Sequence, residues 1–341
     1  MNLINNFIKK KVLIIAEIGV NHNGNIKLAK KHIVEAKKCG ADMVKFQTFK
    51  AENLATKKTP KVKYQIGNKK ETHYQMLKNL EISYKDFLEI KKFCKKKKIL
   101  FSSTPYDPES AKFLIKNKIK VLKISSADLI DEKIHNVLYK FKGEIILSIG
   151  MANEDEIKKT LEFYKKRINK VYILQCVSNY PAKKNNQNIN YIKTLIKKFK
   201  VIPGFSDHTT DHECACLAVA CGAKIIEKHF TLNKKLSGPD HKASADPKDF
   251  KLYVKKIRDT ENFLGSETKK IALEENNMKK ISRKSIVTST NLKKGTILKW
   301  KHLSSKRPGN HILANRYSEL LGKKLLRDLK KDTFLSIRDI K

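Results

Sequence analysis

The sequence predicts an α/β fold, a closed (β/α)8 TIM barrel followed by a small C-terminal domain. Short runs of β-branched residues alternate with amphipathic helical stretches such as IKLAKKHIVEAKKCG as far as Gly265. About eight βα units recur, and eight units over roughly 250 residues are typical of this barrel. After Gly265 the alternation stops and a polar stretch begins. We therefore predict a barrel domain over 1–265, a linker over 266–281 and a small domain over 282–341.

The predicted strands of the barrel span 12–18, 42–47, 99–103, 120–125, 144–149, 170–176, 201–205 and 224–230. Strands that alternate with helices imply right-handed βαβ units and a parallel sheet. A doubly wound open sheet is the alternative, but no G-x-G-x-x-G follows the first strand. We assign a long insertion, from about Thr48 to Leu80, to the first unit, where loops at the barrel rim are often functional.

The formal net charge of +40 raises the question of a nucleic-acid partner. Nearly all of the excess is lysine, in runs such as 95–98, whereas arginine, the better residue for forked phosphate contacts, is scarce. The sequence has no obvious platform of interleaved aromatic residues on which bases could stack. We therefore interpret the charge as a solvated lysine-rich surface that attracts anionic substrates, and we expect no nucleic-acid partner.

Six scattered cysteines form no C-x-x-C pair and argue against a disulfide framework. No apolar run approaches the roughly 20 residues that cross a bilayer. The short apolar stretch at the start lacks a small-residue cleavage site and continues into the first strand. We expect a cytoplasmic protein with no membrane partner.

Polar side chains stand at the C-terminal end of every predicted strand, where a barrel of this kind places its active site. Buried polar groups at all of these ends would be costly if they served packing alone. Lys45 and Lys123 lie on strands two apart and suit one shared anion, with nearby hydroxyl groups donating to it. His208 and His229, on adjacent strands, suit a divalent metal. Glu17 lies on the strand that closes the barrel against the eighth.

These strand ends carry a series of motifs, namely AEIGVNHNG, VKFQTF, FSSTPYD, KISSAD, LSIGMA, FSDHT, EKHFTL and GPDHKAS. In this order they resemble the successive signatures of the sialic acid synthase family, which includes the N-acetylneuraminate, legionaminate and pseudaminate synthases. The segment KRPGN at 306–310 resembles the family's antifreeze-like SAF domain. The resemblance covers most of the chain, from about Val12 to Asn310.

The resemblance implies condensation of phosphoenolpyruvate with N-acetylmannosamine or 2,4-diacetamido-2,4,6-trideoxymannose, releasing phosphate and a nonulosonic acid. It implies a divalent metal, manganese in most relatives with magnesium or cobalt as alternatives, on His208 and His229. It also implies a domain-swapped homodimer in which Arg307 reaches the site of the partner chain. The substrate positions that it implies are Lys45, Gln47, Thr104, Lys123, Ser126, Ser148, Tyr180, Ser206 and Asp240.

Our hypothesis for the mechanism is that C3 of phosphoenolpyruvate attacks the sugar aldehyde, which the metal polarises. Water then adds at C2, and the tetrahedral intermediate expels phosphate. Glu17 is the candidate for positioning or deprotonating that water, or for stabilising the cationic centre, and Lys45 and Lys123 orient the phosphate. The alternatives are a pseudaminate-type synthase, a Schiff-base aldolase with one nucleophilic lysine and, least favoured, a basic nucleic-acid binder.

Overall fold

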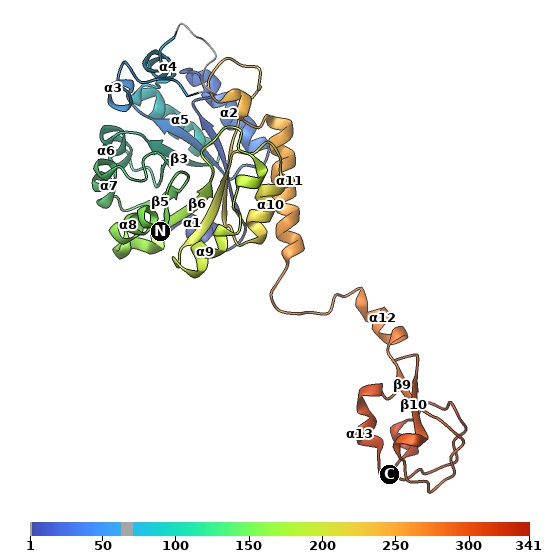
Figure 1. The fold of residues 1–341 in the computed structure, drawn as a ribbon. Helices are drawn as coiled ribbons and strands as arrows, with labels where there is room; N and C mark the ends of the chain where they lie inside the picture. Colours follow the sequence, from blue (N-terminus) through green and yellow to red (C-terminus); the bar gives the residue numbers. More distant parts are fainter. Residues whose placement is uncertain (1, 63–70) are drawn as a thin grey trace. The chain divides into compact units, whose positions relative to one another are not determined.

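Eight parallel strands close into a barrel in the N-terminal unit of the computed structural model, which describes residues 2–62 and 71–341 (Figure 1). The strands are β1 Leu13–Gly19, β2 Met43–Thr48, β3 Leu100–Pro105, β4 Val121–Ile124, β5 Glu144–Ser148, β6 Val171–Cys176, β7 Ile202–Asp207 and β8 Ile225–His229. Strand β1 pairs with both β2 and β8, and Glu17 stands opposite His229 in the closing pair. The predicted TIM barrel is thus confirmed, and the open-sheet alternative is excluded.

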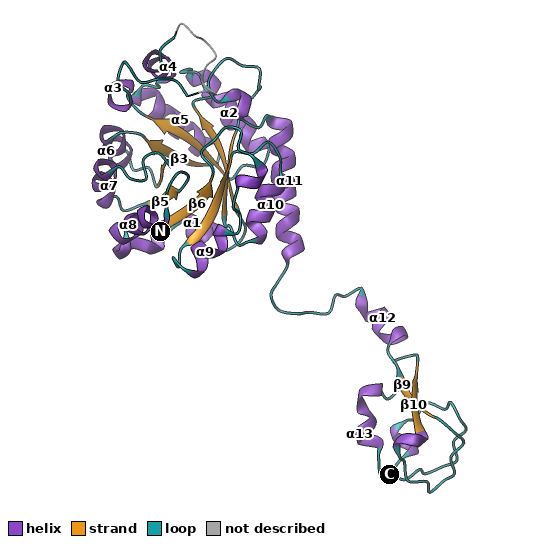
Figure 2. Cartoon of the chain, viewed as in Figure 1, coloured by secondary structure: helices purple, strands orange, loops and turns teal. Residues whose placement is uncertain are grey.

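A ring of helices surrounds the strands, as Figure 2 shows in purple around orange. The helices that follow strands are α2 Ile26–Lys38, α5 Tyr84–Lys96, α6 Pro108–Lys116, α7 Glu132–Tyr139, α8 Glu154–Phe163, α9 Tyr191–Lys197, α10 Glu213–Ala220 and α11 Pro247–Leu264. Side-chain caps explain where several begin: Asn25 accepts from two amides of α2, and Asn153 forms a capping box with Glu156. Aspartate caps followed by proline, at Asp107 and Asp246, start α6 and α11.

The N-terminal end of the barrel is filled by α1, Leu3–Ile8, which the sequence pattern did not reveal as a helix. Ile4 is fully buried and belongs to a cluster of inward-facing strand residues that includes Tyr172. The carboxylate of Glu144 accepts hydrogen bonds from the amide of Ile4 at 2.9 Å and from the hydroxyl of Tyr172 at 2.7 Å. Apolar packing therefore occupies this end and leaves the opposite rim for polar side chains.

The long insertion that we assigned to the first unit follows β2 instead, so that assignment was wrong by one unit. It contains α3, Ala51–Leu54, and α4, His73–Leu80, while residues 63–70 lie outside the described part. Met76, Leu77 and Leu80 of α4 pack with Val20 and Phe49 in a small apolar cluster. The insertion thereby contributes an apolar wall beside the C-terminal rim.

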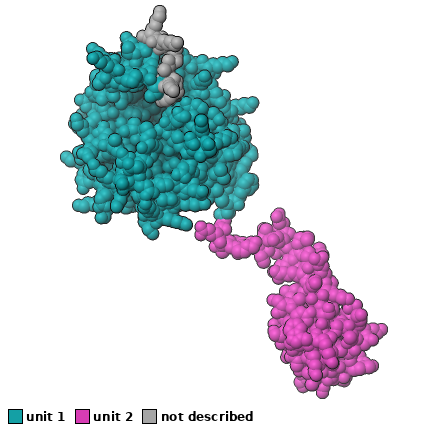
Figure 3. Space-filling model, in the orientation of Figure 1, with its two compact units in different colours: residues 1–265 teal, residues 266–341 magenta. Residues whose placement is uncertain are grey.

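The chain divides into two compact units, Met1–Gly265 and Ser266–Lys341, coloured separately in Figure 3. In the second unit β9, Ser285–Thr288, pairs antiparallel with β10, Leu303–Lys306, and α13 spans Tyr317–Leu320. Helix α12, Glu275–Ser282, lies within the polar stretch that we predicted as a linker. Within residues 2–62 and 71–341, no helix is both long and apolar enough to cross a bilayer.

Candidate active site

A cavity of about 470 Å³ lies at the C-terminal ends of the barrel strands. Every predicted site residue of the barrel lines it, namely Glu17, Lys45, Gln47, Thr104, Lys123, Ser126, Ser148, Tyr180, Ser206, His208, His229 and Asp240. Arg307 belongs to the second unit, where its Nε donates to the carbonyl oxygen of Ser282 at 3.0 Å. The structure therefore brings the barrel residues together and leaves a contribution from Arg307 untested.

Strand alternation explains how these side chains reach the same cavity. Lys45 and Gln47 are two apart on β2, and Glu227 and His229 are two apart on β8, so both members of each pair face inward. The register between neighbouring strands brings a further residue to these pairs, because Glu17 on β1 stands opposite Lys45 on β2.

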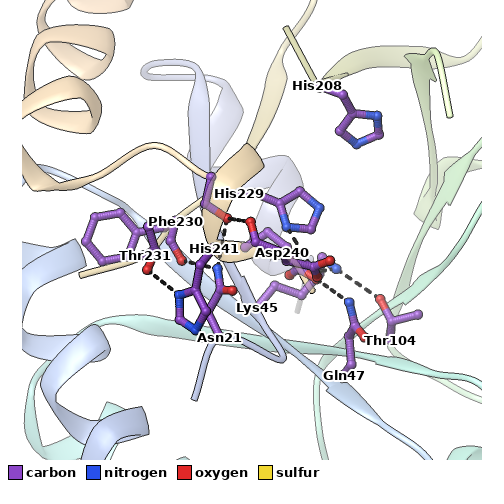
Figure 4. A network of polar contacts seen from close by, with 12 residues as sticks. Asn21, Lys45, Gln47, Thr104, His208, His229, Phe230, Thr231, Asp240 and His241 are labelled. Atoms are coloured by element: carbon purple, nitrogen blue, oxygen red, sulfur yellow. Dashed lines mark hydrogen bonds and ion pairs between the residues drawn. The ribbon is translucent and has the colours of Figure 1, made fainter. Parts of the chain in front are cut away.

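The two lysines enter the cavity as ion-paired ammonium groups. Nζ of Lys45 lies 2.7 Å from Oε2 of Glu17 and donates to Oγ1 of Thr104 at 3.0 Å (Figure 4). Lys123 is paired with Oε1 of Glu227, which is also 3.9 Å from Nζ of Lys45. Burial tends to raise the pKa of Glu227, but Lys123 and Lys45 outweigh it and hold that pKa at about 2.

Glu227 lines the cavity as well, although we predicted it only as one of the polar strand ends and gave it no role in the site. Its carboxylate accepts from Lys123 and also from Oγ of Ser206 at 3.2 Å. The available signal was its position two residues before His229 on the same strand, which places it inward. Glu227 thus places a negative charge beside Lys123 and 3.9 Å from Nζ of Lys45.

The two histidines present neutral imidazoles to the cavity. His208 donates from Nδ1 to the carbonyl oxygen of Val177 at 2.7 Å, so the neutral ring carries its lone pair on Nε2. That nitrogen lies 3.3 Å from Oγ of Ser206 and is the atom that could bind a metal. The ring centroids of His208 and His229 are 5.8 Å apart. Burial lowers the pKa of His208 to about 4, and burial together with His208 lowers the pKa of His229 well below its ordinary value.

A divalent metal fits this arrangement of imidazoles. Nδ1 of His229 is buried and has no hydrogen-bond partner in the described part of the chain, with Oδ2 of Asp240 at 3.9 Å. No group of three or more His, Cys, Asp or Glu side chains is arranged to hold a metal among residues 2–62 and 71–341. Two imidazoles would therefore need water or substrate oxygens to complete the coordination shell.

Two further carboxyl groups face the cavity with raised pKa values. Burial raises the pKa of Glu17, although the neighbouring Lys45 opposes this effect. Burial raises the pKa of Asp240 to about 7, and the charge of Glu17 acts in the same direction. Oε1 of Glu17 also accepts from Nε2 of Gln47 at 3.3 Å. Both carboxyl groups can thus exchange protons closer to neutral pH than an exposed carboxylate does.

A set of hydroxyl groups lines the cavity at the C-terminal ends of β4, β5 and β6. Oγ of Ser126 accepts from the amide of Gly150 at 3.0 Å, and Oγ of Ser148 is buried without a partner in the described residues. A Cβ atom at Gly150 would lie 2.3 Å from Oγ of Ser178, so only glycine leaves this space open. Hydroxyl groups around an open space, with two ammonium groups nearby, suit a phosphate or carboxylate group.

Comparisons with known proteins identify the family and the relatives of this chain. The NeuB family model matches residues 32–269, and the SAF domain model matches residues 283–341. The N,N'-diacetyllegionaminic acid synthase of Campylobacter jejuni is 42% identical, over 96% of this chain and 99% of its own length. The human N-acetylneuraminate-9-phosphate synthase is 32% identical, over 94% of this chain and 90% of its own length. The crystal structure of N-acetylneuraminic acid synthetase from Leptospira borgpetersenii, in complex with citrate, superimposes with a TM-score of 0.70 at 34% identity, covering 79% of this chain and 90% of that chain.

Proposed function

The chain belongs to the NeuB family, and on this premise we propose that it joins phosphoenolpyruvate to an acylated amino-hexose, yielding a nonulosonic acid and phosphate. The observation that carries the proposal is the meeting of Lys45 and Lys123 in one cavity lined by hydroxyl groups. Phosphoenolpyruvate carries two anionic groups, and fixed ammonium groups and hydroxyl donors bind such groups in a defined orientation.

In this proposal the hydroxyl groups of Ser126 and Ser148 bind the phosphate, and the two lysines neutralise the anion. Thr104 holds Lys45 in place through its hydrogen bond of 3.0 Å. Glu17 is the group for the water that adds at C2, because burial raises the pKa of its carboxyl group and so makes the carboxylate a better proton acceptor than an exposed one. Gln47 orients that carboxylate through a hydrogen bond to Oε1, whereas Lys45 faces Oε2.

We propose that His208 and His229 hold a divalent metal, with manganese as the first candidate and magnesium or cobalt as alternatives. The metal would supply Lewis-acid polarisation of the sugar aldehyde. The support lies in the two neutral imidazoles and in the unpartnered Nδ1 of His229.

For the sugar we propose 2,4-diacetamido-2,4,6-trideoxymannose, with N-acetylmannosamine as the alternative. The apolar side chains of Val20, Leu54, Met76, Leu77 and Leu80 line the cavity beside Thr59 and His73, and they suit a C6 methyl group and the methyl of a second acetamido group. The relative that is 42% identical carries a diacetylated product in its name. A pseudaminate-type synthase, with a different amino-sugar, would use the same cavity chemistry.

The test measures phosphate release from phosphoenolpyruvate with each amino-sugar, in manganese and in EDTA. Release with the diacetamido sugar, and weak release with N-acetylmannosamine, is the expected result. No release with any sugar would contradict the synthase. Borohydride trapping with pyruvate tests the aldolase, and we expect no adduct because both lysines are engaged in ion pairs, whereas a Schiff-base lysine must be free to attack a carbonyl.

A further inference from the structure

Asp240 lies in the segment between β8 and α11, which has little regular structure of its own beyond the short turn His241–Ala243. Its carboxyl group nonetheless faces the cavity, 3.9 Å from Nδ1 of His229. A carboxylate on a loop needs neighbouring contacts to keep a fixed orientation, because a small displacement of a binding group is costly for catalysis.

The loop after β1, which carries the NHNG sequence, holds the first part of this segment. Nδ2 of Asn21 donates to the carbonyl oxygen of Phe230 and to Oγ of Ser244, both at 2.9 Å. Ser244 links Asn21 to Asp240, because its Oγ donates to the carbonyl oxygen of Asp240 at 2.7 Å. Figure 4 shows Asn21 beside Phe230 in this network. Asn21 is fully buried, so water does not compete for these bonds.

A second set of contacts passes through His241, which is also fully buried. Nδ2 of Asn23 donates to the carbonyl oxygen of Ser237 at 2.7 Å, so Oδ1 of Asn23 is the atom that faces Nε2 of His241, at 3.3 Å. His241 must then donate from Nε2, and its Nδ1 accepts from the hydroxyl of Thr231 at 2.7 Å. One neutral imidazole thus joins the end of β8, the segment of Asp240 and the loop after β1.

The close approach of these loops restricts other side chains. A Cβ atom at Gly238 would lie 2.7 Å from Oδ1 of Asn23 and 2.7 Å from Cδ2 of His241, and the φ of Gly238 is +149°. Glycine at 238 is therefore required for the contact between Asn23 and His241. The residue immediately before Asp240 is a proline, which restricts the backbone further.

We propose that Asn21 and His241 are positioning residues that hold the carboxyl group of Asp240 at the sugar end of the cavity. Neither side chain is among the residues that line the cavity, so both act through the segment that carries Asp240. The inference rests on the proposed function only in assigning the sugar to Asp240. The hydrogen bonds that hold the segment do not depend on which substrate binds.

The experiment compares Thr231→Val, Ser244→Ala and His241→Phe with the wild-type protein. Thr231→Val is the mildest change, because it keeps the side-chain shape and removes only the hydroxyl group that His241 accepts from. We expect the KM for the amino-sugar to rise about tenfold or more, while the KM for phosphoenolpyruvate stays within about twofold. Hydrogen–deuterium exchange should become faster across 232–246 in each variant.

His135→Phe provides the matched control, because His135 is another buried histidine with two hydrogen bonds, to Tyr164 at 2.7 Å and to the carbonyl oxygen of Leu129 at 2.8 Å. It should lower stability without changing the ratio of the two KM values. Equal changes in both KM values, or unchanged exchange across 232–246 in Thr231→Val, would overturn the inference. Wild-type protein that releases no phosphate would contradict the proposed function alone, and the exchange measurement would still test the contacts.

Discussion

Lys123 on β4 and Glu227 on β8 form an ion pair across the inside of the barrel, although they are 104 positions apart in the sequence. The same carboxylate oxygen lies 3.9 Å from Nζ of Lys45, whose nearer partner is Oε2 of Glu17 at 2.7 Å, so two carboxylates face the two buried lysines. A substrate anion that binds to these lysines must compete with Glu227 or share them with it. We therefore expect Glu227 to influence both the stability of the barrel and the affinity of the cavity for anions.

Replacing Glu227 by Gln tests this role. The variant should lose about 3 kcal/mol of unfolding free energy, because Lys123 would remain buried without its counter-charge. Added inorganic phosphate should raise the melting temperature of the variant more than that of the wild type, since a ligand that binds the folded state stabilises it. Glu132→Gln, which removes an exposed pair with Lys159, serves as the control and should show no such gain. Equal phosphate responses in both proteins would contradict this account.

Glu17→Gln should reduce turnover by about 10²-fold or more, with only a modest change in either KM. Glutamine keeps the shape of the side chain and its contact with Gln47, but it cannot accept a proton from water. Steady-state kinetics with both substrates gives the measurement, and circular dichroism checks that the fold is intact. Turnover equal to that of the wild type would remove Glu17 from the chemistry.

The barrel and most of its cavity could be predicted because both follow from local periodicity. Alternation places Lys45 with Gln47, and the strand-end rule of the barrel then brings Thr104 and His208 to the same rim. The pairing of Glu227 depends on barrel closure, which sets β4 opposite β8, and no local pattern contains that information. Helix α1 was missed for a similar reason, since its six residues are too short for a periodic signal and gain their order from burial of Ile4 inside the barrel.

The pH dependence of sugar use should report the ionisation of Asp240. Burial, supported by the charge of Glu17, raises the pKa of Asp240 to about 7. If the ionised carboxylate binds the sugar, kcat/KM for the sugar should fall as the pH drops below about 7. In Asp240→Asn this part of the decline should disappear from the pH–rate profile, together with most of the activity. A profile in the variant that keeps the same decline would assign it to another group.

The same shift affects stability in the opposite sense. Between the ordinary value of 3.8 and about 7, folded Asp240 holds a proton that the unfolded chain has lost. Its contribution to stability is therefore present at low pH and is lost as the pH rises through about 7. Chemical denaturation measures the unfolding free energy of wild type and Asp240→Asn at pH 5 and pH 8. The difference between the two proteins should be smaller at pH 5 than at pH 8.

Removal of one imidazole should weaken binding of the proposed metal. His229→Gln should reduce the affinity for manganese by at least about 100-fold, because even the loss of a residue that only orients a ligand costs 10- to 100-fold. Equilibrium dialysis followed by elemental analysis measures the bound metal independently of activity. His135→Phe, which changes a buried histidine outside the cavity and leaves His208 and His229 in place, is the control. Manganese binding that is equal in His229→Gln and wild type would place the metal elsewhere.

The resemblance to the sialic acid synthases implies that Arg307 of one chain reaches the site of its partner. Complementation between two inactive variants tests this exchange. If Arg307 of one chain completes the barrel site of its partner, a dimer of Glu17→Gln with Arg307→Ala regains one intact site, made from the wild-type barrel of the second chain and Arg307 of the first. Random assembly makes half of the dimers mixed, each with one of its two sites intact, so co-expression should restore about a quarter of wild-type turnover. Arg307 supplied within its own chain would give no recovery, and a monomer mass in gel filtration would equally contradict the exchange.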